Sequence, residues 1–163
     1  GGLLLYAHTD MLDAHLEVNL RGPLLAMQAV VVQRRHRLSP GTIVNIISIS
    51  EHAGQSYLAP YVAAKAGLAG LTRNVAHAHR WDRVRVNGLD IGWTDTEGED
   101  AVQRHFHDAD DNWRQRAAES LPMGKLAQAD EIAEFVVLLL SDRSGVVTGS
   151  VIDWDQRIVG GFD

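Results

Sequence analysis

The segment from residue 41 to 65, GTIVNIISISEHAGQSYLAPYVAAK, constrains the fold more than any other part of the chain. Its nearly continuous apolar run, Ile43–Ile47, is typical of a strand that is buried on both faces of a parallel sheet. Pro60 suits the first turn of a helix and marks where the next element begins. A strand, a loop and a helix in this order indicate an α/β fold, with Ser48 at the carboxyl end of the strand. Ligands bind at that edge of an open α/β sheet, because the strand ends and the following loops leave a crevice there.

Tyr61 and Lys65 lie four positions apart on the predicted helix. Four steps of about 100° bring two side chains within about 40° of each other on one helix face. A phenol has a reference pKa near 10, and an ammonium group one turn away favours the phenolate. We therefore expect Lys65 to lower the pKa of Tyr61, so that Tyr61 exchanges a proton with an alcohol or carbonyl while Ser48 holds the substrate oxygen. Tyr and Lys at this spacing also occur on solvated helix faces, so the pair alone does not define a site.

The order of these motifs resembles the short-chain dehydrogenase/reductase family, in which N-I-S-S at a strand end precedes Y-x-x-x-K on the next helix. Residues 45–48 read N-I-I-S, so isoleucine replaces the first serine of the motif and the catalytic serine is kept as Ser48. Tyr61 follows Ser48 by 13 positions, which is the usual spacing in the family. Ser50, two residues further into the loop, is the second candidate for the serine.

A further motif of the family, V-N-L-x-G, resembles residues 18–22. In the family its asparagine holds a water that links the active-site lysine to solvent, and Asn19 matches that asparagine. The alternative for Asn19 is an amide that satisfies backbone hydrogen bonds beside Pro23, where we expect a kink or a break in the helix.

The loop after the predicted strand 83–91 resembles the family motif P-G-x-V-x-T. Gly92 and Thr96 are kept, whereas Ile91 replaces the proline and Thr94 replaces the valine. The resemblance implies that Ile91, Gly92, Thr94 and Thr96 bind the nicotinamide end of the cofactor, together with Tyr61 and Lys65. From the residues alone, Gly92 also suits a simple turn at a strand end.

The resemblance implies an NAD(P)-dependent oxidoreductase that interconverts a small-molecule alcohol and a carbonyl, with NAD or NADP as cofactor. Tyr61 would transfer the proton, Lys65 would lower its pKa and bind the ribose, Ser48 would position the oxygen and Asn19 would complete a proton relay. One alternative is a truncated, non-catalytic remnant that acts as a dimerisation or binding module. Another is a nucleotide-sugar epimerase or dehydratase, which shares the Tyr and Lys chemistry.

The remaining patterns predict the other elements of one domain, residues 1–163. We expect a loop over residues 1–9, a helix from about residue 10 to 37 with Thr9 or Asp10 as N-cap, and a helix from Pro60 to about 79. A polar helical flap over the substrate follows at residues 97–121, then a helix at 130–140 and a last strand at 146–154. Small residues on the helix after Pro60 let another helix approach, and the resemblance implies a homodimer or homotetramer whose contact is formed by this helix and the one that carries Asn19.

The chain begins Gly-Gly without methionine, and the family's glycine-rich phosphate turn would precede Gly1. We therefore expect an incomplete Rossmann-like doubly wound parallel sheet that lacks the N-terminal βαβ units. Its strands are the contiguous three on one side of the family's sheet, so the strand at Ile43–Ile47 becomes an edge, which favours pairing with further strands. We predict that these residues belong to a longer polypeptide or are held by a partner.

Composition narrows the class of protein further. The formal charge is −6 and no long run of Lys or Arg occurs, which argues against a nucleic-acid surface. The chain has no cysteine, no signal peptide and no apolar run long enough for a membrane helix, so we expect a cytoplasmic protein. The pairs His77/His79 and His105/His107 are spaced two apart, which points their side chains away from each other on a helix, and we expect no metal.

Overall fold

The computed structural model describes residues 8–52 and 54–160, so the loop predicted at residues 1–9 lies almost entirely outside the described part. The helical elements are α1 (Thr9–Leu16), η2 (Glu17–Arg21), α2 (Gly22–Arg37), η3 (Ile49–His52), α3 (Ala59–Ala78), η4 (Arg80–Asp82), α4 (Glu97–His107), α5 (Trp113–Glu119), α6 (Ala129–Leu140) and η5 (Asp142–Ser144). The strands are β1 (Gly41–Ile46), β2 (Val84–Ile91), β3 (Thr94–Asp95), β4 (Ala127–Gln128) and β5 (Val151–Trp154).

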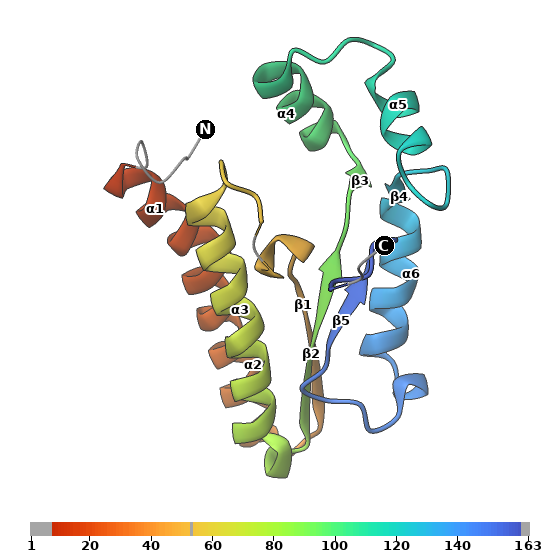
Figure 1. The fold of residues 1–163 in the computed structure, drawn as a ribbon. Helices are drawn as coiled ribbons and strands as arrows, with labels where there is room; N and C mark the ends of the chain where they lie inside the picture. The colour runs from red at the N-terminus through yellow and green to blue at the C-terminus, as the bar shows by residue number, and fades with distance from the viewer. Residues whose placement is uncertain (1–7, 53, 161–163) are drawn as a thin grey trace.

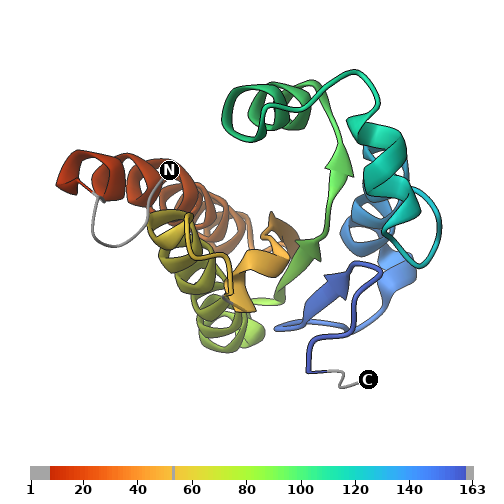
Figure 2. The same ribbon diagram turned by 45° about the horizontal axis from the view of Figure 1, so that its top comes forward.

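A parallel sheet in the order β1-β2-β5 lies at the centre of the fold. Pairing begins at Gly41 and Val84 between β1 and β2, and at Gly88 and Val151 between β2 and β5, so β2 is the middle strand and pairs on both sides. Helices α2 and α3 cover one face of the sheet and α6 covers the other (Figures 1 and 2). Helices α4 and α5 and the short parallel pair β3-β4 lie beyond the carboxyl ends of the strands. This arrangement is the predicted α/β Rossmann-like fold with three contiguous parallel strands.

Strand β1 is an edge strand within the described residues, as predicted, because it pairs with β2 alone. The prediction that this strand is buried on both faces is wrong for most of its residues. Only Asn45 and the following Ile47 are buried, whereas Ile43 and Val44 are half-buried and Ile46 is 39% exposed. The apolar run of Ile43–Ile47 is typical of a strand inside a sheet, but β1 is an edge strand within the described residues, so one side of it is open to solvent.

The helix predicted from about residue 10 to 37 is present and does not break at Pro23. It passes instead through one π-helical turn, η2, directly before Pro23. Proline has no N–H for the carbonyl four residues earlier, which is that of Asn19, and a wider turn accommodates the missing bond. The helix begins one residue earlier than predicted: His8 is the N-cap residue and makes no side-chain capping bond.

Helix α3 packs closely on the sheet and on the π turn. A Cβ at Gly67 would lie 3.2 Å from a methyl carbon of Leu20, so glycine at this position allows the close approach that the small residues predicted. The buried amide of Asn45 donates to Thr72 Oγ1 at 2.9 Å and fastens β1 to α3. Leu20, together with Met27 and Val31 of α2, packs on the apolar core that α3 and the sheet share.

Two predicted elements differ in extent from the structure. The flap at 97–121 is two helices, and Asp108, with a φ of 50°, ends α4. The last strand begins at Val151, because Gly149 with a φ of 74° interrupts the extended backbone before it. Thr148 still reaches the sheet, since its Oγ1 accepts a hydrogen bond from Val86 N at 3.1 Å.

Candidate active site

Ser48 lies at the carboxyl end of β1, where Ile47 N continues the pairing with β2 by donating to Leu89 O at 2.9 Å. The Ser48 hydroxyl accepts from Ser50 N at 3.2 Å and donates to Ser50 Oγ at 3.1 Å. Ser50 is buried and its own hydroxyl donates to Gln55 Oε1 at 2.5 Å. Ser50 therefore supports the turn that presents Ser48, which remains half-buried.

Tyr61 and Lys65 lie on the first turns of α3, on the face next to this strand end. The Lys65 ammonium donates to Ile46 O at 3.0 Å and lies 5.5 Å from the centroid of the Tyr61 ring. Lys65 is 9% exposed, so both its position and its direction are fixed by packing. The structure thus brings Ser48, Tyr61 and Lys65 together at one edge of the sheet, as the spacing predicted.

The pKa of Tyr61 is raised above its usual value of 10, although we expected Lys65 to lower it. Burial of the phenol is the largest cause; a hydrogen bond with Ser48 opposes it, and the negative charges of Glu99 and Asp90 add to it. Burial likewise lowers the pKa of Lys65, and Asp90 opposes that shift. The expectation fails because the ammonium lies over the ring and is directed at a backbone carbonyl, so burial of the phenol dominates.

Asn19 lies half-buried in the π turn, which packs against α3. Within the described residues its side-chain amide makes no hydrogen bond to Lys65 or to any other group. The structure therefore brings the segment of Asn19 to α3 but does not join its amide to Lys65, and the proton relay stays a prediction.

The loop after β2 is held by short polar contacts. Gly92 N donates to Trp154 O at 3.2 Å, and Thr94 Oγ1 donates to Gly92 O at 3.0 Å. Thr96 is the N-cap of α4, where its hydroxyl accepts from Glu99 N at 3.0 Å. A Cβ at Gly92 would collide with the carboxylate of Asp155, so close packing alone accounts for glycine here. The threonine hydroxyls thus maintain the loop, and contacts of residues 91–96 with nicotinamide stay a prediction.

The flap is fixed to the sheet edge by a network of charges. Arg114 donates to both Asp95 and Asp100, at 2.7 Å and 2.8 Å, and Trp113 Nε1 donates to Asp100 at 2.7 Å. Hydrogen bonds from Trp113 and Arg104 lower the pKa of Asp100 to about 2. These contacts join α4, α5 and β3, although no motif in the sequence pointed to them.

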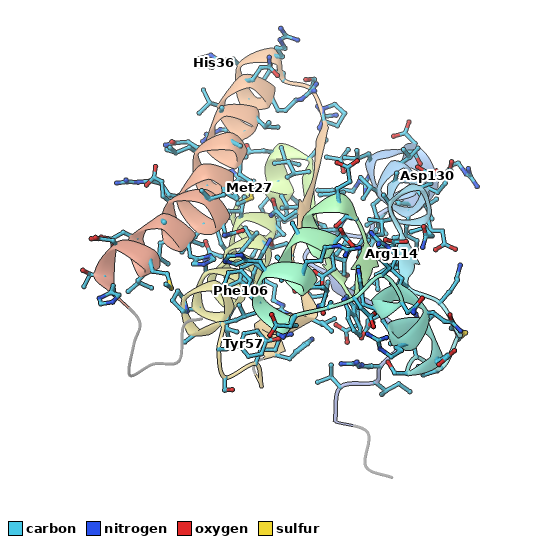
Figure 3. All side chains as sticks on the ribbon, turned by 90° about the horizontal axis from the view of Figure 1, so that it is seen from above. Met27, His36, Tyr57, Phe106, Arg114 and Asp130 are labelled. Carbon is cyan, nitrogen blue, oxygen red and sulfur yellow. The ribbon has the colours of Figure 1, made fainter. Side chains whose placement is uncertain are left out.

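The aromatic residues of the flap divide into two groups. His107 and the buried Trp113 line a hollow of about 280 Å³ together with Trp93, whose ring stacks on that of Trp113 at 6.3 Å. Phe106 is 59% exposed and is outside that lining. His107 also contacts Tyr57 of the loop after β1, with ring centroids 5.7 Å apart, and Figure 3 shows Tyr57 and Phe106 in this region from above. The flap and the loop after β1 therefore meet at this pair of rings, a contact that the sequence did not predict.

No helix in the described part of the chain has the length and hydrophobicity needed to cross a lipid bilayer.

A parallel sheet with Ser48 at the carboxyl end of β1, and with Tyr61 and Lys65 beside it on α3, agrees with the class that the comparisons show. A family model described as enoyl-(acyl carrier protein) reductase matches residues 2–156. The chain belongs to the short-chain dehydrogenase/reductase family.

Two curated relatives illustrate the similarity. An acetoacetyl-CoA reductase of Shinella zoogloeoides is 36% identical over 143 residues, which are 88% of this chain and 56% of the relative. The human (3R)-3-hydroxyacyl-CoA dehydrogenase is 31% identical over 150 residues, which are 92% of this chain and 55% of the relative. The chain therefore spans about half the length of the curated relatives it matches.

Solved structures show the same fold. A 4-hydroxyisoleucine dehydrogenase complexed with NADH has a TM-score of 0.85 and 26% identity, and the match covers 98% of this chain and 63% of that chain. A gluconate 5-dehydrogenase from Burkholderia cenocepacia in complex with NADP and tartrate has a TM-score of 0.83 and 27% identity, and the match covers 98% of this chain and 60% of that chain.

Proposed function

We propose that the protein that carries this chain is an NAD(P)-dependent oxidoreductase that interconverts an alcohol and a carbonyl. The observation that carries the proposal is the convergence of Ser48, Tyr61 and Lys65 at the carboxyl end of β1, with the Lys65 ammonium 5.5 Å from the Tyr61 ring. Membership of the family and the reductases and dehydrogenases among the relatives support the same reaction.

The residues of the site divide the work of carbonyl reduction. Ser48 Oγ orients the substrate oxygen, and Tyr61 donates its phenolic proton to that oxygen as a hydride reaches the carbonyl carbon. A nicotinamide cofactor, NAD or NADP, would supply the hydride in its reduced form; in alcohol oxidation its oxidised form would accept the hydride and the Tyr61 phenolate would take up the hydroxyl proton. The raised pKa keeps Tyr61 a neutral phenol at physiological pH. A neutral phenol is the acid that carbonyl reduction needs.

The residues present fit a nicotinamide nucleotide. An ammonium group has three donors, and the bond from Lys65 to Ile46 O uses one of them. The others are available to the hydroxyls of a ribose. Gly92, Thr94 and Thr96 follow the carboxyl end of β2, the strand that pairs with β1, and Ile91 ends β2.

Substitution of the site residues in the full-length protein tests the proposal. Tyr61→Phe should lower kcat by about 10² to 10⁴-fold and leave the affinity for the cofactor, measured by nicotinamide fluorescence, nearly unchanged. Ser48→Ala should lower kcat far more than Ser50→Ala, which separates the two serine candidates. Retained turnover in Tyr61→Phe would remove Tyr61 from its role and with it the proposed reaction. Absence of cofactor binding in the wild type would favour the non-catalytic module.

A second copy of the chain is the partner that the surface of α2 fits. Val18 of η2 and Leu25 and Val32 of α2 recur every seven residues and are 70%, 54% and 49% exposed, so large apolar side chains face solvent along these two elements. Sedimentation should show a dimer or tetramer, and Leu25→Glu should dissociate it. Val146→Glu, at a 94% exposed position elsewhere on the surface, is the control and should leave the assembly intact. An unchanged mass for Leu25→Glu would exclude this face.

A further inference from the structure

A second cluster of titratable side chains lies where η3 crosses the carboxyl ends of β2 and β5. His52 Nε2 is 3.4 Å from Asp90 Oδ2 and 3.2 Å from Asp153 Oδ1. Asp90 and Asp153 are register partners on neighbouring strands, so their side chains leave the same face of the sheet. Glu51, His52 and Asp90 each offer one ligand atom within 4.8 Å of those of the other two.

Asp90 provides an independent sign that this cluster binds a ligand. Its side chain is 0% exposed, and neither carboxylate oxygen has a hydrogen-bond partner within the described residues. A buried carboxylate without donors is costly, and proteins compensate such charges by pairing or by metal coordination. Oδ2 of Asp90 lies 3.4 Å from His52 Nε2, and the backbone of Ser48 is close enough to lower the pKa of this carboxyl group slightly.

Two cations of the described chain lie at the edge of this cluster. Three carboxylates, those of Glu51, Asp90 and Asp153, surround His52. Arg73 approaches Glu51 at 3.8 Å but is 53% exposed, so solvent screens its charge. Lys65 interacts with Asp90 electrostatically, but its ammonium donates to Ile46 O, and within the described residues His52 alone forms an ion pair with Asp90.

We propose that Glu51, His52 and Asp90 bind a divalent transition-metal cation, with Asp153 as the ligand on the solvent side. Two donor atoms that share a tetrahedral ion at about 2.1 Å lie about 3.4 Å apart, which is close to the 3.4 Å and 3.2 Å that separate His52 Nε2 from Asp90 Oδ2 and from Asp153 Oδ1. One imidazole among carboxylates suits Zn²⁺ or Mn²⁺ better than Ca²⁺, which prefers oxygen ligands alone. Asp153 is 46% exposed at the side chain, so an ion reaches the cluster past this residue.

Titration of the metal into the full-length protein tests this site. The protein is dialysed against EDTA, freed of the chelator and titrated with ZnCl₂ and with MnCl₂ by calorimetry. The wild type should bind one equivalent of at least one of the two ions. Asp90→Asn, which keeps the shape of the side chain, should weaken binding by at least about 100-fold, because loss of an outer-shell partner alone costs 10–100-fold.

Two more variants make the result decisive. His52→Ala removes a partly exposed side chain of η3, which lies outside the sheet, and it should weaken binding as strongly as Asp90→Asn. His105→Gln, on exposed helix α4, is the control and should bind as the wild type does. Absence of stoichiometric binding to the wild type, or an affinity unchanged in either cluster variant, would overturn the proposal and leave a plain ion pair between His52 and the aspartates. Melting curves by circular dichroism verify that each variant folds.

Discussion

Replacing Asp90 with asparagine should stabilise the metal-free protein at neutral and basic pH and change its stability little below about pH 4. The pKa of Asp90 is raised from 3.8 to about 6, and burial of the carboxyl group is the main cause. The charges of Glu51 and Asp153 raise this pKa further, whereas His52 lowers it. The folded state therefore holds the proton of Asp90 more tightly than the unfolded state does.

The sign and size of the effect follow from linkage. Between pH 3.8 and about 6 the folded state binds more protons than the unfolded state, so the free energy of unfolding falls as pH rises through this range. A pKa difference of one pH unit corresponds to about 1.4 kcal/mol, which gives a full cost of about 3 kcal/mol above pH 6. We expect Asp90→Asn to recover about 1–3 kcal/mol at pH 8.

Urea denaturation in the presence of EDTA, followed by circular dichroism at several pH values from 4 to 8, measures this difference. The stability gain of Asp90→Asn over the wild type should grow with pH and level off above about pH 6. Asp153→Asn is the matched control at a half-exposed position and should give a smaller difference with less dependence on pH. A variant Asp90→Asn that is less stable than the wild type at pH 8 would refute the reasoning, because it would show that the ionised carboxylate stabilises the fold.

Three further predictions concern residues elsewhere in the fold. Arg85→Met should lower the free energy of unfolding by about 3 kcal/mol, since Arg85 donates to Ser144 Oγ of η5 at 2.9 Å and to carbonyls at the end of α6 and in the loop before β5. The exposed Arg83→Met should cost less than about 1 kcal/mol in the same urea titration, and equal costs would show that the bonds of Arg85 do not stabilise the fold. Gly92→Ala should destabilise by about 1–3 kcal/mol through overpacking against the Asp155 side chain, and a second change, Asp155→Ala, should restore stability unless the loop fails for another reason. The difference between the ultraviolet pH titrations of the wild type and of Tyr61→Phe should show a phenol that ionises above pH 10. The stability that this group contributes is therefore lost as pH rises further. Ionisation below pH 10 would contradict burial as the dominant cause of the shift in the pKa of Tyr61.

The strand, loop and helix around Ser48 could be predicted because local signals agree there. The apolar run sets the strand, Pro60 sets the start of α3, and the helical period places Tyr61 and Lys65 on one face. The edge position of β1 also followed from the sequence through the family's strand order. The partial exposure of β1 could not be predicted, because an apolar run indicates that a strand suits a buried position and does not show which neighbouring strands are present.

Long-range contacts account for what the sequence did not reveal. The π turn before Pro23 depends on how α3 supports the helix on both sides of the proline, and no local pattern distinguishes it from a kink. The break of the flap at Asp108 depends on a single residue in the left-handed region, within a polar stretch that has no apolar period to interrupt. Arg85 reads as an ordinary strand charge, yet it is half-buried and holds the end of α6.

Tyr61 shows the same limit in the chemistry of the site. The spacing on α3 correctly predicts that Lys65 lies next to Tyr61. The pKa of Tyr61, however, depends on how deeply the phenol is buried and on the direction of the Lys65 ammonium, and the spacing gives neither. Asp90 left a weak signal in the sequence: it is an acid inside an apolar strand end, between Leu89 and Ile91. That position alone could not show that His52 folds over it from a different loop.

Asp90 links the two sites electrostatically. Its negative charge raises the pKa of Tyr61 and opposes the lowering of the pKa of Lys65 by burial. Both effects disfavour the phenolate and favour the ammonium. A cation held by Asp90 and His52 would cancel the charge that acts on α3, and the pKa of both Tyr61 and Lys65 would fall. Occupancy of the second cluster would therefore shift the proton balance of the first, through a carboxylate that belongs to the sheet beneath both.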